Sequence, residues 1–414
     1  MTLRTDSYIE IVYICLMFRP LQFLLCICLI SSFSLSAQWK KIYTGISNDL
    51  FDVHQAPGMV YAAGQGSTVL KSADSGKSWE KLNLNIPSNL RTVYFFDSLT
   101  GMVSGENARI QKTYNGGKTW TQKYVRTAAY TYDMTFNGSN GIAVGKDLLA
   151  ISSNDAGETW TVDTTPLVRK QLNSVAISPS GHCWTVGDSG FIFKKHLSDK
   201  KWTQVNSGSM INLTSVSCIG DSIIIITGGM PDTALVGKHY NILLYSSDAG
   251  QSWFRTTLPE LKTIYSSWFQ DSDTGFICGT NGIISKSYQI FNFRSQQLTG
   301  TASALNKIDF QNNNGLVVGD GGTILRTTNR GGRGLSTPDL AIPSIKLYPN
   351  PSSSTFTVSA KDHQIISLTA QNINGQSIDI LQNGNTYSCD YKGILILRIQ
   401  LDNQQIWNGT IALH

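Results

Sequence analysis

The sequence is poor in charged residues and in histidine. Only 15% of its 414 residues are charged, and 33 basic against 28 acidic residues give a net charge of +5. No basic run with interleaved aromatic residues occurs, so nucleic acid is not an expected partner. The six histidines are isolated, and no metal-ligand cluster, phosphate-binding loop or Ser-His-Asp elbow stands out. We therefore predict neither a metal nor a cofactor.

Cysteines are also few, and they do not form a disulfide framework. Three of the seven precede residue 30, and the other four show no paired spacing: Cys183, Cys218, Cys278 and Cys389. We interpret these four as buried free thiols. In contrast, the 37 glycines and the 10% of aromatic residues are typical of a turn-rich, all-β protein.

Long apolar runs are confined to the segment Met17–Ala37, "MFRPLQFLLCICLISSFSLSA". One positive charge, an apolar core and a small residue at Ala37 predict a signal peptide over residues 1–37. Asp6 and Glu10 do not suit such a segment, so Met17 is an alternative start. The other interpretation, an uncleaved membrane anchor, requires a longer apolar core. We expect no transmembrane span after cleavage.

Tryptophans divide the chain into repeats. Trp39, Trp79, Trp120, Trp160, Trp202 and Trp253 are separated by 40, 41, 40, 42 and 51 residues. Each unit reads as four short strands separated by turn residues, which is the pattern of a propeller blade. The fold class is therefore an all-β, seven-bladed β-propeller over residues 38–334. Its blades begin near Leu50, Leu90, Ala129, Leu172, Leu213, Ile264 and Leu305.

The turn before four of these tryptophans carries a recurring motif, as in "SADSGKSW" (72–79). Its Asp or Asn can accept backbone N–H bonds within the turn, and its Gly can adopt positive φ. The motif resembles the Asp-box, or BNR, repeat, and we expect it to stabilise the blades. Its residues are Asp74, Gly76, Trp79, Asn115, Gly117, Trp120, Asp155, Gly157, Trp160, Asp248, Gly250 and Trp253.

The seventh unit has Gly334 where the tryptophan and the fourth strand are expected. The segment "QWKKIYTG" (38–45) matches that missing piece. We predict that it pairs as the outer strand of blade seven and closes the ring, because an open propeller leaves two sheet edges unpaired.

Ligand-binding residues are expected on the face opposite the Asp-boxes, where the turns between second and third strands lie. The residue after the second-strand glycine would stand there in six blades: Gln65, Glu106, Lys146, Asp188, Thr280 and Asp320. An insertion of about eleven residues in blade five, "GGMPDTALVGKHYN", adds Lys238 and His239, and Arg126 lies at a blade junction. The alternative is that these charges are simply solvated.

The repeats "FFDSLTGMVSGENARIQKTYNGGKTW" and "DFQNNNGLVVGDGGTILRTTNRGG" resemble the photosynthesis system II assembly and stability factor family. That resemblance implies a seven-bladed propeller that acts as a binding scaffold; a photosynthetic role is not carried over. The leading hypothesis is a non-catalytic module that binds an unknown protein or glycan. The alternative is a secreted glycan hydrolase, sialidase- or xyloglucanase-like, using Glu106, Asp188 and Asp320. No arginine motif matches that of sialidases.

A linker rich in Gly, Ser and Pro (335–343) precedes a second predicted domain, residues 344–414. The motif Tyr348, Pro349, Asn350 and Pro351, with later alternating strands, resembles the type A C-terminal sorting domain of the type IX secretion system. The resemblance implies a small Ig-like β-sandwich that contacts the secretion machinery. It also implies a secreted or outer-membrane cell-surface location, reached through the periplasm. The alternative is an ordinary Ig-like accessory module.

Overall fold

The computed structural model describes residues 39–125, 130–165, 170–231, 239–258, 263–272, 274–287, 293, 295–331, 345–348, 350, 352–360, 364–372, 376–402 and 406–413. Several predicted features lie outside these residues: the signal segment 1–37, the linker 335–343, Arg126, Lys238, Pro349 and Pro351. Among the described residues, no helix has the length and apolar character needed to cross a membrane.

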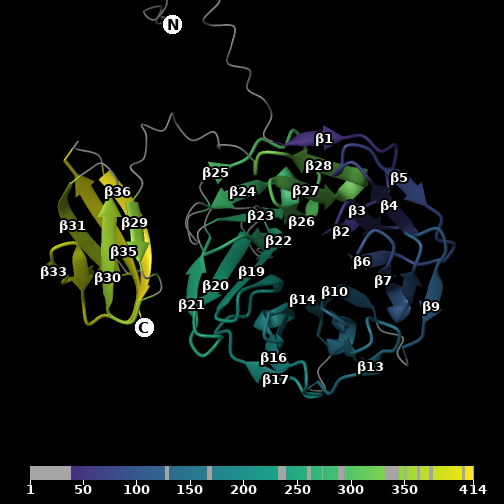
Figure 1. Cartoon of the computed structure of the whole chain (residues 1–414), viewed down its shortest axis with the longest axis horizontal. Helices are drawn as coiled ribbons and strands as arrows, with labels where there is room; N and C mark the ends of the chain where they lie inside the picture. The colour runs from purple at the N-terminus through teal and green to yellow at the C-terminus, as the bar shows by residue number, and fades with distance from the viewer. Residues whose placement is uncertain are drawn as a thin grey trace, which may run out of the picture. The chain divides into compact units, whose positions relative to one another are not determined.

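Seven four-stranded antiparallel sheets are arranged around one axis as propeller blades (Figure 1). Blade one contains β2 (Leu50–Ala56), β3 (Met59–Gly64), β4 (Thr68–Ser72) and β5 (Glu80–Leu82). Blade two contains β6 (Leu90–Phe95), β7 (Gly101–Gly105), β8 (Ile110–Thr113) and β9 (Thr121–Lys123). Blade three contains β10 (Thr131–Asn137), β11 (Asn140–Gly145), β12 (Ala150–Ser153) and β13 (Thr161–Val162). Blade four contains β14 (Leu172–Ile177), β15 (His182–Gly187), β16 (Ile192–His196) and β17 (Thr203–Val205).

The remaining three blades follow the same plan. Blade five contains β18 (Leu213–Ile219), β19 (Ile223–Pro231), β20 (His239–Ser246) and β21 (Phe254–Thr257). Blade six contains β22 (Ile264–Phe269), β23 (Gly275–Gly279), β24 (Ile284–Ser287) and β25 (Ser295–Gln296). Blade seven contains β26 (Leu305–Gln311), β27 (Asn314–Gly319), β28 (Thr323–Thr327) and β1 (Lys40–Ile42). The seven blades confirm the predicted fold class.

The N-terminal strand closes the ring. β1 pairs antiparallel with β28, with Lys40 opposite Arg326 and Ile42 opposite Ile324. The preceding Trp39 is fully buried and contacts the rings of Phe310 and Phe276 edge-on, at 5.8 and 6.3 Å between centroids. The sheet order therefore confirms the predicted closure of blade seven by the strand at residues 40–42.

One boundary differs from the sequence-based expectation. In blade one, Leu50 pairs with Gly64 at the end of the second strand. The residue that pairs in the same way with Gly145 in blade three is Thr131, so the first strand begins there. The predicted start, Ala129, lies outside the described residues. The hydrophobic pattern misplaced this start because a threonine, fully buried here, occupies the usual leucine position.

The apolar core lies between neighbouring blades rather than inside each one. Leu50 and Val53 of blade one, for example, pack with Leu316 and Val318 of blade seven. Each blade is a thin sheet with both faces covered, so its strands are apolar on both sides near the axis. The four cysteines Cys183, Cys218, Cys278 and Cys389 are free, and burial raises the pKa of Cys183 and Cys218 to about 12.

The Asp-box turns are built alike. In blade one, Asp74 Oδ1 accepts the backbone N–H groups of Lys77 and Ser78, and Ser72 Oγ accepts that of Gly76. Gly76 has a φ of +86°, and a Cβ there would lie 2.6 Å from the Leu316 side chain of blade seven. The glycine is thus required both by its backbone conformation and by the close approach of the neighbouring blade.

The C-terminal domain is a sandwich of two four-stranded sheets. One sheet has the order β29 (Ile345–Tyr348), β30 (Thr355–Ala360), β34 (Thr386–Ser388), β33 (Leu381–Asn383). The other has the order β32 (Ser377–Ile378), β31 (Ile365–Asn372), β35 (Gly393–Leu401), β36 (Ile406–Leu413). Its core includes Phe356 stacked on Tyr387, at 5.8 Å between centroids. Of the predicted sorting motif, Tyr348 ends β29 with its side chain exposed.

Candidate functional site

The six residues predicted from the sequence occupy equivalent positions, one per blade, in the turns between second and third strands. Five of them begin short 3-10 turns: η1 (Glu106–Ala108), η2 (Lys146–Leu148), η3 (Asp188–Gly190), η4 (Thr280–Gly282) and η5 (Asp320–Gly322). Each donates its backbone N–H to the carbonyl of the residue before the first strand of its own blade, as Glu106 does to Asn89 at 3.1 Å. The same bond holds Gln65 to Asp49. These turns define what we call the turn face of the propeller.

A glycine makes this close approach possible. A Cβ at Gly105, which precedes Glu106, would lie 2.0 Å from the carbonyl oxygen of Asn89. The equivalent glycines of the other blades are equally close to the backbone, so only glycine fits at the end of the second strand. The recurring glycine of the sequence therefore positions the turn-face residues.

A second set of residues lies on this face, and the sequence analysis did not predict it as a set. The first strand of every blade contains a β-bulge, so that its second residue is left unpaired beside the turn face. All seven of these residues are half-buried, and together we call them the bulge ring: Phe51, Arg91, Tyr132, Asn173, Thr214, Tyr265 and Asn306. Alignment of the blades on their first leucines would have revealed this position, but a bulge leaves no signature in a single strand.

Arg91 is the cation of the bulge ring. Its guanidinium lies over the ring of Phe51 from the neighbouring blade, 3.8 Å from the centroid. Among the described residues, no carboxylate lies within ion-pairing distance of Arg91. Burial raises the pKa of the nearby Tyr132, partly offset by the charge of Arg91. Arg91 is thus held in place by stacking, and within the part of the chain that the structure describes its N–H donors have no hydrogen-bond partner.

Two carboxylates of the turn face are tied to asparagines of the bulge ring. Asn173 donates to Asp188 at 3.1 Å and to the carbonyl of Leu213 in the next blade at 2.9 Å. In blade seven, Asn306 donates in the same way to Asp320 and to Leu50 of blade one, both at 2.9 Å. These contacts link neighbouring blades, so Asp188 and Asp320 have a structural role beside any role in binding.

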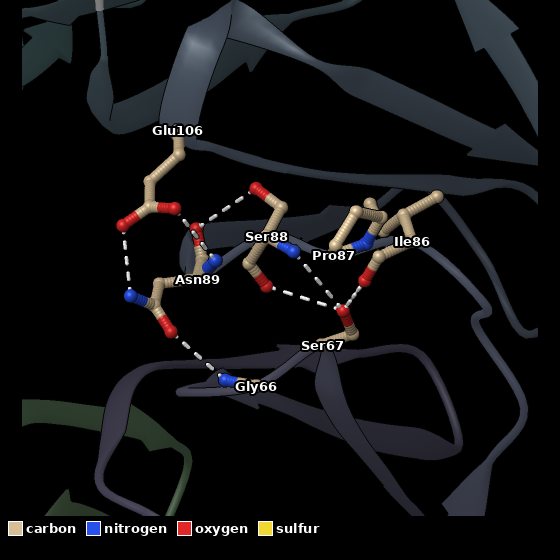
Figure 2. A pocket seen from close by; sticks show the side chains of 7 residues that line it. All are labelled: Gly66, Ser67, Ile86, Pro87, Ser88, Asn89 and Glu106. Atoms are coloured by element: carbon tan, nitrogen blue, oxygen red, sulfur yellow. Dashed lines mark hydrogen bonds between the residues drawn. The ribbon is translucent and has the colours of Figure 1, made fainter.

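Glu106 lines a pocket between blades one and two (Figure 2). The pocket has a volume of about 320 Å³. Its walls are Gly66 and Ser67 from the blade-one turn, residues 86–89 from the connection between the blades, and Glu106. We refer to it as the Glu106 pocket. Its size is at the lower end of the range for small-ligand sites.

A polar belt surrounds the propeller axis one residue further along each first strand. Its members are Asp52, Thr92, Asp133, Ser174, Ser215, Ser266 and Lys307. At five of the seven blade junctions the side chain of one member accepts the backbone N–H of the next blade, as Asp52 does from Val93 at 2.8 Å. These hydrogen bonds therefore connect neighbouring blades at their innermost strands.

The charged members of the belt meet at the axis. Lys307 Nζ lies 3.6 Å from Asp52 Oδ1 and 3.4 Å from Asp133 Oδ1, although the three residues belong to blades seven, one and three. Burial raises the pKa of Asp52 to about 6. Burial alone would lower the pKa of Lys307, but the carboxylates of Asp133 and Asp52 outweigh the effect of burial and raise the pKa of this lysine. We call these three residues the axial cluster; the sequence analysis did not find it.

The insertion of blade five extends the turn face. β19 and β20 continue past the usual glycine, with Met230 opposite Tyr240 and Pro231 opposite His239. The tip, residues 232–238, lies outside the described residues, as does the side chain of His239. The structure therefore brings Gln65, Glu106, Lys146, Asp188, Thr280 and Asp320 to one face, whereas Arg126 and Lys238 are not described.

Two protein-family profiles match the chain. The family described as Photosynthesis system II assembly factor YCF48 matches residues 30–114 and 79–170. The family described as Secretion system C-terminal sorting domain matches residues 346–409. Among curated proteins, the chain is 22% identical over 290 residues to the Photosystem II assembly lipoprotein Ycf48 of Synechococcus sp. (strain CC9902), covering 60% of this chain and 87% of that protein.

Solved structures share the fold. YCF48 bound to a D1 peptide matches with a TM-score of 0.58 and 16% identity, over 70% of this chain and 97% of that one. YCF48 from Cyanidioschyzon merolae matches with a TM-score of 0.57 and 15% identity, over 72% and 100%. An ancestral GH74 enzyme matches with a TM-score of 0.55 and 12% identity, over 91% and 54%. At these identities the likeness establishes the fold alone. Together with the family matches, it identifies a YCF48-like β-propeller followed by a secretion-system C-terminal sorting domain, which implies export through the type IX machinery.

Proposed function

We propose that this chain is a non-catalytic binding protein, secreted or held at the cell surface, whose propeller binds a partner on the turn face. The observation that carries the proposal is Arg91, stacked 3.8 Å from Phe51 with no carboxylate partner among the described residues. A preorganised, unpaired guanidinium beside half-buried aromatic rings is the kind of anchor that protein interfaces use.

The partner that fits this surface best is a segment of another protein. One similar structure is of YCF48 bound to a D1 peptide, which favours a peptide as the ligand class. The bulge ring offers aromatic side chains and hydrogen-bonding groups in one continuous circle, and β19 with β20 adds a raised hairpin beside it. A glycan is the other candidate, and a binding array distinguishes the two.

The placement and hydrogen bonding of the three candidate carboxylates favour a binding role over glycan hydrolysis. Hydrolysis needs two carboxyl groups facing one glycosidic bond. Glu106, Asp188 and Asp320 stand in turns of blades two, four and seven, and each accepts hydrogen bonds from an asparagine. Fluorogenic glycosides should therefore show no turnover. Turnover that Glu106→Gln or Asp188→Asn abolishes would establish the hydrolase instead.

The test of binding uses the full exported chain on an array of glycans and surface proteins. For the partner found, Arg91→Ala should weaken affinity at least about tenfold, because a charge-assisted hydrogen bond is lost. Lys77→Ala and Lys118→Ala, exposed in Asp-box turns on the opposite face, serve as matched controls and should leave affinity unchanged. If Arg91→Ala binds the partner as tightly as the two control variants do, the turn face is not the binding surface.

Export is tested separately. Deletion of residues 344–414 should retain the propeller in the periplasm, because the sorting domain is the signal that the secretion machinery reads. Cell fractionation followed by immunoblotting measures this. Continued appearance of the truncated chain in the medium would contradict the role of the sorting domain.

A further inference from the structure

The Glu106 pocket has a chemistry of its own, because most of the hydrogen-bond donors in its walls are already engaged. The backbone N–H of Gly66 donates to the Asn89 side chain at 2.9 Å, and that of Ser67 donates to the Ser88 carbonyl at 2.8 Å. The N–H of Ser88 donates to the Ile86 carbonyl at 3.0 Å, and the N–H of Glu106 donates to Asn89 at 3.1 Å.

The hydroxyl donors and the asparagine are engaged as well. Ser67 Oγ donates to the carbonyls of Ile86 and Ser88, and Ser88 Oγ donates to that of Asn89 (Figure 2). Asn89 gives both its backbone N–H and its side-chain amide to Glu106, at 3.3 and 2.8 Å. An anionic ligand would find few N–H or O–H groups here to bind it.

The free hydrogen-bonding capacity of the pocket is therefore that of an acceptor. A carboxylate has about four lone-pair sites, and Asn89 occupies one on each oxygen of Glu106. Among the described residues, no Lys, Arg or His lies within ion-pairing distance of Glu106. Asn89 thus fixes the orientation of a carboxylate that has no cationic partner among the described residues.

We propose that the Glu106 pocket binds the cationic head of a basic side chain, a lysine ammonium or an arginine guanidinium, from the partner held on the turn face. This proposal rests on the proposed function and adds the charge of the ligand. Pro87 and Ile86 supply an apolar wall for the aliphatic stem of such a side chain. The volume of about 320 Å³ accommodates one side chain rather than a folded segment.

Blades four and seven do not offer the same site. Their turn-face carboxylates, Asp188 and Asp320, accept asparagine amides from their own first strands, and those amides also bond the next blade. Of the three carboxylates, only that of Glu106 accepts a hydrogen bond from the connection between two blades, and this connection forms a wall of the pocket. The cation site is therefore specific to the junction of blades one and two.

The experiment measures binding of four capped tripeptides, acetyl-Gly-Xaa-Gly-amide with Xaa Lys, Arg, Gln or Glu, to the full exported chain by NMR titration. The Lys or the Arg peptide should bind at least about tenfold more tightly than the Gln and Glu peptides, since only the cations make a charge-assisted bond. The Lys and Arg arms distinguish the two basic side chains.

Two variants locate the effect. Glu106→Gln removes the charge but keeps an oxygen for Asn89, and it should abolish the preference for the basic peptides. Glu80→Gln, a matched change on the exposed outer strand of blade one, should preserve it. Glu106→Asp keeps the charge, and it should retain part of the preference; thermal unfolding verifies that each variant is folded.

The outcomes separate this proposal from the function on which it rests. Lys and Arg peptides that both bind no more tightly than the Gln peptide, or a preference that survives Glu106→Gln, would overturn the cation site. Binding of the partner from the array that still depends on Arg91 would then leave the proposed function intact. Partner binding that is indifferent to Arg91 would overturn the proposed function, whatever the tripeptides do.

Discussion

Ring closure by the N-terminal strand makes one residue, Trp39, a sharp test of the fold. Its side chain is 1% exposed and packs edge-on against Phe310 of blade seven and Phe276 of blade six. It lies beside a strand of only three residues, Lys40–Ile42. Because so few backbone pairs hold that strand, the tryptophan should supply much of the free energy that keeps blade seven closed.

The magnitude follows from its burial. Truncation of a buried tryptophan to alanine costs about 3–5 kcal/mol, and edge-to-face pairs add to that cost. Each kcal/mol lowers Tm by about 2–4 °C for domains of about 150–250 residues, and the lower end applies to this larger propeller, so Trp39→Ala should lower Tm by about 6–10 °C. Trp39→Phe should cost less, about 1 kcal/mol, because the indole N–H has no partner among the described residues and its loss removes a buried unsatisfied donor.

Thermal unfolding followed by circular dichroism measures these differences. Tyr43→Ala is the matched control, because Tyr43 is 87% exposed just after the same strand and its truncation should change stability by less than about 0.5 kcal/mol. Deletion of residues 38–43 should destabilise the whole propeller at least as much as Trp39→Ala. A Tm for Trp39→Ala equal to that of the unaltered chain would refute both the closure and the energetic role of β1.

Three further predictions concern charged groups. Burial opposes ionisation of Asp155, but hydrogen bonds in its Asp-box outweigh burial and lower its pKa to about 2. The stability that this group contributes above its unfolded pKa near 3.8 should therefore disappear as pH falls toward 2. In urea unfolding between pH 2 and 5, Asp155→Asn should reduce this loss of stability at low pH. Lys307→Met leaves the axial carboxylates without their cation and should cost about 3–5 kcal/mol at pH 7. Because the pKa of Asp52 is raised to about 6, Asp52 is protonated at pH 4, and the variant should lose less stability there than at pH 7. An equal loss of unfolding free energy at both pH values would contradict the interaction of Lys307 with the axial carboxylates. Lys112→Met should cost about 1–3 kcal/mol by breaking its bonds to the Asp-box of blade three, whereas exposed Lys118→Met should not.

The fold could be predicted from the sequence because its signals are local. A tryptophan recurs about every 40 residues, and each Asp-box places its acid and its glycine within a single turn. The missing tryptophan of blade seven was visible for the same reason, and it led to β1. The turn-face positions were also predictable, since each follows a glycine that the backbone geometry requires, as Gly105 before Glu106.

The site could be predicted only in part, because its remaining contacts join residues far apart in the chain. Asp52, Asp133 and Lys307 meet only when seven blades close around one axis. The pairing of Arg91 with Phe51 depends on bulges in two different blades. The pocket around Glu106 needs the connection at residues 86–89, which has no periodic pattern of its own.

Blades four and six have no recognisable Asp-box, and they show how an outer strand is held without one. In blade six, Phe293 takes the tryptophan position and packs edge-on against Phe269 at 6.1 Å, as Trp160 packs against Phe136 at 5.8 Å in blade three. The aromatic contact is thus preserved where the acid is lost.

In blade four the aromatic residue is kept and the electrostatics are replaced. Trp202 donates to Asp163 at 3.1 Å, and the same carboxylate oxygen pairs with buried Lys195 at 2.7 Å. Lys195 also donates to the carbonyl of Asp199 in the hairpin where an Asp-box would stand. Every blade therefore places an aromatic ring, buried or half-buried, beside its outer strand. A hydrogen-bonded Asp or Asn side chain is the usual, though not the only, means of holding the turn that leads to that ring.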